Sequence, residues 1–431
     1  MTEPLSADEF SHLMAACGPF EARPKLAVAV SGGADSMALM HLVHVWAQDR
    51  GGQVCTLTVD HDLRPEAGAE AAQVRRWCEA AGIEHHVLRW EGPKPRARLQ
   101  ERARRARYDL MAGWCRRHGL LHLLVAHHQG DQAETFLMRR ERGSGPEGLA
   151  AMPPVALPPG AGYRWPRLLR PLLPVPKCRL EATLVARQQS WIDDPSNENA
   201  AYQRVRLRKR IVASGDPDAF RAELAAQADA YRKARDRVET ELGRLLADRL
   251  SLSPYGYALI GNHQSIAADL AIPLWSRMLR TIGGRAYPPR GDRVGRFVAD
   301  LGEGGFRGAT LAGCVVQPRG DALLVAREPA GIEGERRLDR ELVWDNRFLI
   351  RNGTGGPFTV RKLGEDGVRT LNRRWPLGKG RGVLPLALRS LPGLFRGGEL
   401  VGLPHFAGAS PTAVATHGVE AAFVPTVPLL W

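Results

Sequence analysis

Two patterns of hydrophobic and polar positions alternate along the first 150 residues. Short, continuous apolar runs are typical of strands buried on both faces, and they predict strands at residues 26–30, 54–59, 86–90 and 120–126. Between them, apolar residues recur at helical spacing and predict helices at residues 36–48, 66–81, 98–118 and 131–140. This order predicts an α/β fold, with a parallel sheet that carries helices on both faces.

The pattern changes beyond this region. A Pro-rich stretch at residues 152–176 interrupts the alternation and includes PPVALPPGAG, which we expect to form a surface loop. Residues 218–250 are Ala-rich, with apolar side chains near heptad spacing, and predict a long amphipathic helix. Beyond about residue 340, short strand-like runs precede a Leu-rich segment. A chain of this length predicts several domains, which we place at 1–215 (the sheet domain), 216–335 (mainly helical) and 336–431 (small α+β).

The composition is typical of a soluble globular protein, since 44% of the 431 residues are hydrophobic and 25% are charged. No apolar run approaches the roughly 18 residues of a membrane span, so we expect no membrane partner. The acidic start, MTEPLSADEF, lacks a basic and then apolar signal, so we expect a cytoplasmic protein. The six cysteines show no C-x-x-C spacing, which argues against a zinc site, an iron–sulfur cluster or a disulfide framework.

The formal net charge is +14, and arginine predominates over lysine. Such a balance favours a polyanionic partner, although a GC-rich genome would also enrich arginine. Clustering is more informative than the total charge. A dense basic cluster follows the motif DPSN at 194–197, and we expect it to contact nucleic-acid phosphates in a salt-dependent way. Its members are Arg204, Arg206, Arg208, Lys209 and Arg210.

The first predicted strand runs into its helix through SGGADS, residues 31–36. Glycine allows the backbone to approach a ligand closely, and the helix start directs N–H groups and positive dipole into the turn. Such a turn is typical of a site that binds an anion, and we expect that anion to be phosphate. It matches neither the Walker loop nor the dinucleotide fingerprint, so backbone N–H groups, Ser31 and Ser36 would hold the phosphate oxygens.

Asp35 would repel phosphate unless a bridging Mg²⁺ lay between them; alternatively, Asp35 is an ordinary helix cap. Parallel sheets bind ligands at the carboxyl ends of their strands, where polar clusters fall at 31–36, 60–64 and 127–131. Asp131 also follows a strand end, so one ion could bridge Asp35 and Asp131, although Asp131 could simply cap its helix. Adjacent residues point to opposite faces, so His127 and His128 are poorly placed to share an ion.

SGGADS after a buried strand resembles the pyrophosphate loop of the N-type ATP pyrophosphatases, which adenylate a carbonyl oxygen. Other motifs are similar to those of the tRNA(Ile)-lysidine synthetase family within that group. The resemblance covers about residues 25–210 and returns more weakly at WDNRF (344–348) and at 384–404. The motifs are VDHDLRPEAGAEA (59–71), ARRARY (103–108), AHHQGDQAETFLMRRERGSGPEGL (126–149), RPLL (170–173) and DPSN (194–197).

The chain departs from that family's pattern at three positions. Gly130 stands where an aspartate is usual, so one metal or substrate contact is missing or shifted. Gln100 replaces a frequent glutamate, and Val205 replaces a usual asparagine.

The resemblance implies an enzyme that uses ATP and Mg²⁺ to join free lysine to the first anticodon cytidine of the CAU isoleucine tRNA. Adenylated cytidine would be the intermediate, and lysidine, AMP and pyrophosphate the products. The second and third domains would contact tRNA, and the oligomeric state stays open, a homodimer included. The resemblance implies catalysis by Asp35, Asp131 and Arg104; metal binding by Asp35 and Asp131; ATP binding by Ser31, Gly32, Gly33, Ala34, Asp35, Ser36 and His61; and tRNA or substrate binding by Arg107, Glu134, Arg204 and Arg208.

Less specific interpretations remain beside this one. Arg104, Arg107 and Tyr108 share a helix face and, without the resemblance, would be a solvated basic face. Another enzyme of the group is an alternative, but a tRNA thiolase should carry cysteine pairs, and an ammonia-using synthetase needs no basic RNA surface. A non-catalytic RNA-binding relative is a further alternative: Gly130 favours it, whereas the intact SGGADS argues against it.

Overall fold

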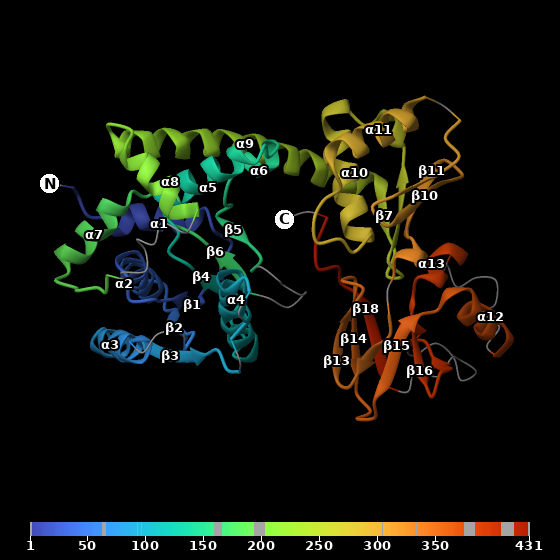
Figure 1. The fold of residues 1–431 in the computed structure, drawn as a ribbon, viewed down its shortest axis with the longest axis horizontal. Coiled ribbons are helices and arrows are strands. Elements are labelled where there is room, and N and C mark those ends of the chain that lie inside the picture. The colour runs from blue at the N-terminus through green and yellow to red at the C-terminus, as the bar shows by residue number, and fades with distance from the viewer. Residues whose placement is uncertain are drawn as a thin grey trace. The chain divides into compact units, whose positions relative to one another are not determined.

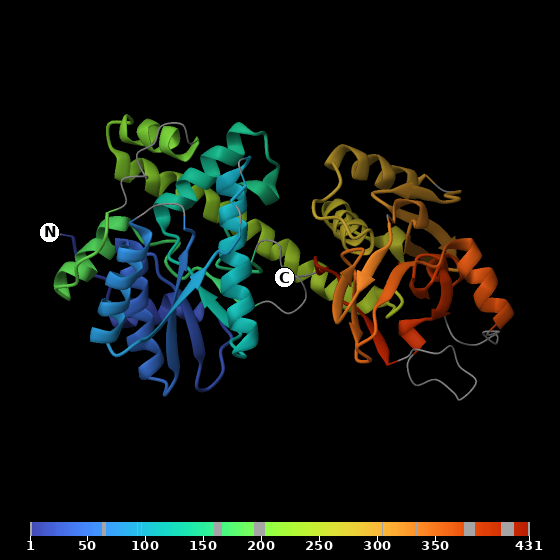
Figure 2. The same cartoon turned by 60° about the horizontal axis from the view of Figure 1, so that its bottom comes forward.

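The computed structural model describes residues 2–62, 66–92, 94–95, 97–158, 166–193, 203–303, 305–332, 334–374, 384–406 and 418–429. The chain divides into two compact units, Met1–Asp236 and Arg237–Trp431 (Figure 1, Figure 2). Each unit is described by itself. The division into three domains at 215/216 and 335/336 stays a prediction.

A largely parallel sheet forms the centre of the first unit, with the strand order β3-β2-β1-β4-β6-β5. β2 and β3 lie on one side of β1, and β4 and β6 lie on the other. Such a reversal of strand order opens a crevice at the carboxyl ends of the two central strands. β5 runs antiparallel to β6. The strands are β1 (Lys25–Ala29), β2 (Gln53–Asp60), β3 (Glu84–Arg89), β4 (His122–Leu124), β5 (Val155–Ala156) and β6 (Arg167–Leu169).

The helices of this unit confirm the predicted alternation, with boundaries that differ by at most two residues. The amphipathic helix expected at 218–250 is also confirmed as α9, which carries the chain from the first unit into the second. The helices are α1 (Ala7–Ala15), α2 (Ala34–Gln48), α3 (Ala67–Ala80), α4 (Leu99–Arg117), α5 (Gln129–Glu141), α6 (Pro146–Leu149), α7 (Lys177–Ala186), α8 (Gln203–Val212) and α9 (Pro217–Arg249).

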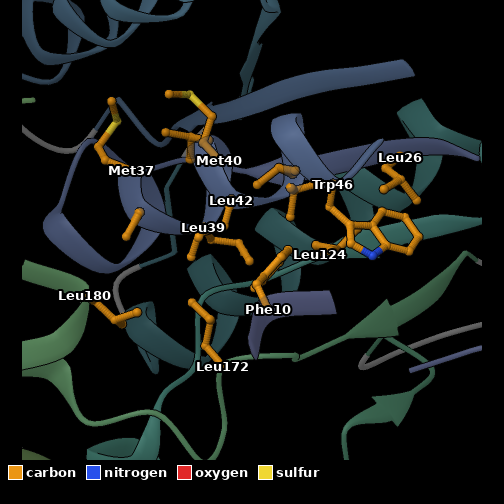
Figure 3. Packing of buried hydrophobic residues seen from close by; sticks show 14 of the residues in the cluster. Phe10, Leu26, Met37, Leu39, Met40, Leu42, Trp46, Leu124, Leu172 and Leu180 are labelled. Atoms are coloured by element: carbon orange, nitrogen blue, oxygen red, sulfur yellow. The ribbon is translucent and has the colours of Figure 1, made fainter. Parts of the chain in front are cut away.

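The two faces of the sheet are covered by different helices, as the strand pattern requires. Leu26 and Val28 of β1 belong to the core that contains α1, α2, α3 and α7 (Figure 3). Ala27, between them, belongs to the opposite core, which contains α4. Alternate residues of a strand point to opposite faces, so a continuous apolar run is needed to fill both cores. Each buried Leu or Met contributes roughly 1.5–3 kcal/mol.

The interpretation of residues 152–176 as an interruption was partly wrong. The structure places β5 and β6 there, and β6 pairs in parallel with β4. Leu168, Leu169 and Leu172 are fully buried. This Leu-rich run completes the sheet, and the prolines beside it masked its strand pattern. Residues 159–165 lie outside the described part of the chain.

A further apolar cluster joins α5, α8 and the first part of α9. Phe136 and Leu137 of α5 pack in this cluster with Leu207 and Ile211 of α8. The packing fixes α8 against α5, and thereby brings the basic face of α8 beside the helix that follows β4.

Three antiparallel sheets make up the described strands of the second unit. Their orders are β7-β8-β11-β10-β9, β12-β15-β16-β17 and β13-β14-β18. The strands are β7 (Leu250–Leu252), β8 (Tyr257–Gly261), β9 (Ala309–Leu311), β10 (Cys314–Arg319), β11 (Ala322–Arg327), β12 (Arg336–Leu338), β13 (Glu341–Trp344), β14 (Phe348–Asn352), β15 (Phe358–Lys362), β16 (Pro392–Arg396), β17 (Glu399–Gly402) and β18 (Val419–Phe423).

The segment expected to be mainly helical, 216–335, therefore also holds a sheet. Its apolar runs CVVQPR and ALLVAR pair across a short turn, which accounts for β10 and β11. The remaining helices of this unit are α10 (Ala268–Ile282), α11 (Gly291–Gly302), α12 (Gly364–Arg374) and α13 (Pro385–Arg389), with 3₁₀ turns η2 (His263–Ser265), η3 (Pro329–Gly331) and η4 (Pro404–Phe406).

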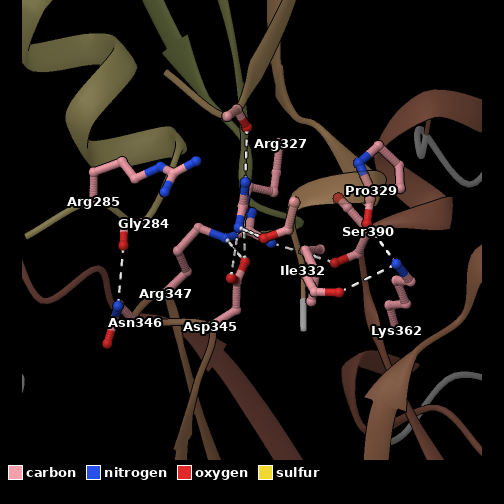
Figure 4. Close-up of polar contacts among 12 residues, drawn as sticks. Gly284, Arg285, Arg327, Pro329, Ile332, Asp345, Asn346, Arg347, Lys362 and Ser390 are labelled. Carbon is pink, nitrogen blue, oxygen red and sulfur yellow. Dashed lines mark hydrogen bonds and ion pairs between the residues drawn. The ribbon is translucent and has the colours of Figure 1, made fainter. Parts of the chain in front are cut away.

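The WDNRF motif forms the turn between β13 and β14. Asp345 accepts hydrogen bonds from Arg327 (3.0 Å) and from Arg347 (2.7 Å), both of which are almost completely buried (Figure 4). The guanidinium of Arg347 also donates to the carbonyls of Gly256 and Ser390. One carboxylate thus neutralises two buried cations, and this arrangement ties the turn to β11 and, through Arg347, to Gly256 and Ser390.

Candidate active site

The SGGADS turn connects β1 to α2 at the reversal of strand order. Gly32 has a φ of 88°, and its carbonyl accepts a hydrogen bond from the N–H of Ile192. A Cβ at this position would lie 2.8 Å from Ile192 Cδ1 and 2.9 Å from Val74 Cγ2. Both the backbone conformation and the close packing therefore require glycine.

Two serines brace the turn from within. The N–H of Ser31 donates to Ser36 Oγ over 3.1 Å, and that hydroxyl donates to the Gly33 carbonyl over 2.9 Å. Gly33 is the N-cap of α2, and no side chain of the described residues caps that end. Backbone N–H groups and the positive end of the helix dipole are thus directed into the turn, as an anion site requires.

A cavity of about 570 Å³ opens beside this turn at the carboxyl ends of the strands. The three polar clusters predicted at this edge all contribute to it, through residues such as Asp35, His61 and His127. Ser31, Gly33, Ala34 and Ser36 also line it, whereas Gly32 packs on Ile192 and Val74. Arg64, in the second cluster, lies outside the described residues.

The carboxylates of Asp35 and Asp131 both lie near the ring of His128. His128 Nε2 lies 3.6 Å from Asp35 Oδ2 and 3.7 Å from Asp131 Oδ2. Asp131 Oδ2 also accepts a hydrogen bond from the His128 N–H over 3.0 Å, so Asp131 does cap α5. Capping and proximity to Asp35 are therefore compatible.

The Asp35 carboxyl is poorly solvated. Burial raises its pKa, and the positive charge of Lys177 opposes this rise. Its Oδ1 is buried and has no hydrogen-bond partner within the described residues. In the described chain, no group of three or more His, Cys, Asp or Glu residues could hold a metal ion. Carboxylate oxygens beside an anion turn nevertheless fit a hard ion such as Mg²⁺, provided that phosphate oxygens complete its shell.

Arginines gather around Tyr108 on α4. The guanidinium carbons of Arg104 and Arg107 lie 5.2 and 5.7 Å from the centre of its ring, so the three residues share a face as predicted. Arg107 lines the cavity, whereas Arg104 is not among its lining residues. Arg170, 6% exposed, donates to His127 Nδ1 over 3.2 Å and to the Pro153 carbonyl.

His61 also lines the cavity. Its ring meets Trp90 edge-on, with 5.9 Å between the ring centres. Burial lowers the pKa of His61, and the positive charge of Arg107 acts in the same direction. Both effects favour the neutral form of this imidazole.

Glu134 and Arg208, both predicted to bind substrate, contact each other. Glu134 is 4% exposed, and its Oε1 accepts a hydrogen bond of 2.5 Å from Arg208 Nε. Although burial opposes it, this bond raises the pKa of Arg208. Arg206, Lys209 and Arg210 of the same helix are exposed. The side chain of Arg204 and the whole DPSN motif lie outside the described residues.

Comparison with known proteins gives this site a context. Residues 3–214 match the family model of the PP-loop domain, an ATP-binding domain. A tRNA(Ile)-lysidine synthase of Ruegeria pomeroyi is 34% identical over 92% of this chain and 92% of its own length. The chain belongs to the tRNA(Ile)-lysidine synthase family. Proteins of the same name from Hyphomonas neptunium and Bradyrhizobium sp. are 39% and 38% identical, over 68% and 76% of this chain and 78% and 95% of their own lengths.

From the sequence, no role was assigned to two cationic residues of this chain, Lys177 and Arg170. Lys177, at the first turn of α7, lines the cavity, and its charge acts on Asp35. Arg170 was quoted only as part of RPLL, without a role of its own. Both follow β6, the strand that the sequence did not reveal, so the carboxyl end of a predicted strand there would have drawn attention to them.

A helix that spans a membrane must be both long and apolar. Among the described residues, no helix combines the necessary length with the necessary apolar character.

Proposed function

We propose that the chain is a ligase that uses ATP to join free lysine to the wobble cytidine of the isoleucine tRNA with a CAU anticodon. The observation that carries this proposal is the cavity at the strand reversal, where an uncapped helix start and Asp35 face the same space. Membership of a family whose curated relatives are named for this reaction supports the substrate assignment.

In the first step, the cytosine carbonyl oxygen attacks the α-phosphorus of ATP. A carbon–oxygen–phosphorus link forms as the bond to the departing pyrophosphate breaks. Charge grows on the leaving pyrophosphate, and the N–H groups of the SGGADS turn, Ser31 and the Lys177 ammonium are placed to stabilise it. His61 and Arg107 would contact the nucleotide from the cavity walls.

Asp35 and Asp131 are the residues that would hold Mg²⁺, which supplies positive charge beside the phosphates. Oδ1 of Asp35, which has no hydrogen-bond partner within the described residues, supports this assignment. Arg104, beside Tyr108, is assigned to the activated base, because a guanidinium donates to phosphate and carbonyl oxygens at once.

In the second step, the neutral amine of lysine attacks the activated ring carbon and loses one proton to solvent water, and AMP leaves with the former carbonyl oxygen. We assign the Glu134–Arg208 pair to this side of the site. The buried carboxylate offers an acceptor to the amino acid, and the guanidinium offers a donor to its carboxylate or to tRNA phosphate. Arg204 is assigned to the same strip of α8.

The tRNA itself would extend over the basic face of α8 and over the segments predicted as second and third domains. The net charge of +14 supports a polyanionic partner. We place the reaction in the cytoplasm, where this tRNA, ATP and lysine occur together.

The direct test is incorporation of labelled lysine into a transcript of this tRNA. We expect incorporation that requires ATP and that disappears when the first anticodon base is changed from C to U. The same reaction with sulfide in place of lysine tests for a thiolase. Absence of lysine transfer to the C-starting anticodon would refute the proposal.

A further inference from the structure

Gly130, which stands where the family usually has an aspartate, makes room for a neighbouring ring. A Cβ added at Gly130 would lie 2.7 Å from His128 Cε1 and 3.1 Å from His128 Nδ1. Carbon atoms do not approach that closely, so any larger residue here would displace the imidazole. The departure from the family pattern and the position of His128 are therefore one feature.

The ring of His128 is held in a defined orientation. The N–H of Gly130 donates to His128 Nδ1 over 3.0 Å, so this nitrogen is an acceptor and carries no proton. In the neutral ring, the proton is then on Nε2. His128 Nε2 lies 3.6 Å from Asp35 Oδ2 and 3.7 Å from Asp131 Oδ2.

We propose that His128 is a positioning residue for the two carboxylates. Its Nε2–H lies between their Oδ2 atoms, offsets their mutual repulsion and sets their separation. Oδ1 of Asp35, which is buried and has no partner within the described residues, would then be available to a divalent ion bound with the nucleotide. The inference rests on the proposed function only in taking ATP as that nucleotide.

If the role of His128 were purely structural, it would consist of capping helix α5 and nothing more. His128 is the N-cap of α5, and its side-chain acceptor satisfies the Gly130 N–H. Asparagine supplies an acceptor at the same place and is a favoured N-cap residue. It lacks a donor at the position of Nε2, however. His128→Asn therefore separates the cap from the contact with Asp35 and Asp131.

The experiment is a calorimetric titration of Mn²⁺, and then Mg²⁺, into the full chain with an ATP analogue that cannot be cleaved between the α and β phosphates. We expect His128→Asn to bind the ion about tenfold or more weakly, with an unchanged denaturant midpoint. His128→Gln, whose amide reaches the Nε2 position, should recover part of the affinity. Unchanged affinity in His128→Asn would overturn the inference.

Gly130→Ala gives a second test, because a structural account and the proposed role of His128 predict different results for ion binding. Alanine favours a helix over glycine, so a structural account predicts a protein at least as stable, with normal ion binding. Displacement of the ring predicts weaker ion binding despite the more stable helix. Normal binding in Gly130→Ala would also overturn the inference.

The outcome can be told apart from a failure of the proposed function. Lysine transfer by the unmodified chain, with unchanged ion binding in both variants, would refute the role of His128 and leave the function standing. Weaker ion binding in both variants would support the role of His128 even if the unmodified chain transferred no lysine.

Discussion

Gly32 illustrates at the scale of one residue how the anion turn depends on the packing behind it. We expect Gly32→Ala to lower the free energy of unfolding by about 2–4 kcal/mol, because a left-handed backbone costs about 1–2 kcal/mol and the 2.8 Å contact with Ile192 adds overpacking. Gly82 is the matched control. Its φ is 68°, but an added Cβ would meet no described atom within 4 Å.

Urea unfolding of the two variants gives the comparison. Gly82→Ala should lose only the backbone part, about 1–2 kcal/mol. Equal losses in the two variants would show that Ile192 and Val74 do not confine the turn.

In the proposed mechanism, Lys177 would provide the cation that Walker loops carry within their own motif. We expect Lys177→Gln to lower kcat/KM for ATP about 10- to 100-fold, as for the loss of a hydrogen bond to a charged group. Glu181, whose carboxylate lies 3.5 Å from the Lys177 ammonium, supplies the control, since Glu181→Gln leaves the lysine in place. Similar losses in both variants would point to a disturbed helix α7.

The same substitution has a consequence for pH. The Lys177 charge lowers the pKa of Asp35 against the raising effect of burial. Without that charge, Asp35 takes up a proton at a higher pH, so the acid limb of the kcat/KM profile should move upward in Lys177→Gln. A limb that moved downward would exclude this contact.

The positions of these residues could be predicted to different degrees. Ser31, Asp35 and Asp131 were predictable because each follows a strand that a continuous apolar run reveals. Lys177 could not be found in this way, because the prolines around β6 conceal its strand. His128 lies between two carboxylates only because Gly130 lacks a side chain, and sequence alone does not reveal that distance.

At the scale of elements, the turn between β13 and β14 depends on a single carboxylate. Asp345→Asn would leave Arg327 and Arg347 buried with no opposite charge on Asp345. We expect the free energy of unfolding of the second unit to fall by about 3–5 kcal/mol. Asp339→Asn is the control, since its pair with Arg337 is more than 60% exposed on both sides and is worth under about 1 kcal/mol.

Guanidinium unfolding followed by far-UV circular dichroism would separate the two variants. If the free energy of unfolding fell no further in Asp345→Asn than in Asp339→Asn, the buried contacts of Asp345 with Arg327 and Arg347 would not stabilise this turn. The sequence showed WDNRF only as a resemblance, because the partner Arg327 lies in a different sheet.

Long elements were more predictable than short ones for a related reason. The 33 residues of α9 carry many repeats of one pattern, whereas β5 has two residues and β6 has three. A short strand depends on pairing with the adjacent strands of the sheet, and the sequence alone does not show which strands are adjacent.

At the scale of the whole molecule, the basic face of α8 should make binding to tRNA dependent on salt. The logarithm of Kd should rise linearly with the logarithm of salt concentration, by roughly 0.7–0.9 per phosphate contact. Replacing the exposed Arg206 and Lys209 by Gln should lower this slope by roughly one to two. A filter-binding series that gave the same slope for the variant would remove α8 from the tRNA surface.

The central claim is that the SGGADS turn and Asp35 hold the polyphosphate of ATP while the tRNA base is activated. It is tested most directly by pyrophosphate release in the presence of tRNA and lysine, in the unmodified chain and in Asp35→Ala. We predict release that requires the tRNA and falls at least about 100-fold in the variant, with an unchanged unfolding midpoint. Pyrophosphate release by Asp35→Ala at the rate of the unmodified chain would contradict the account.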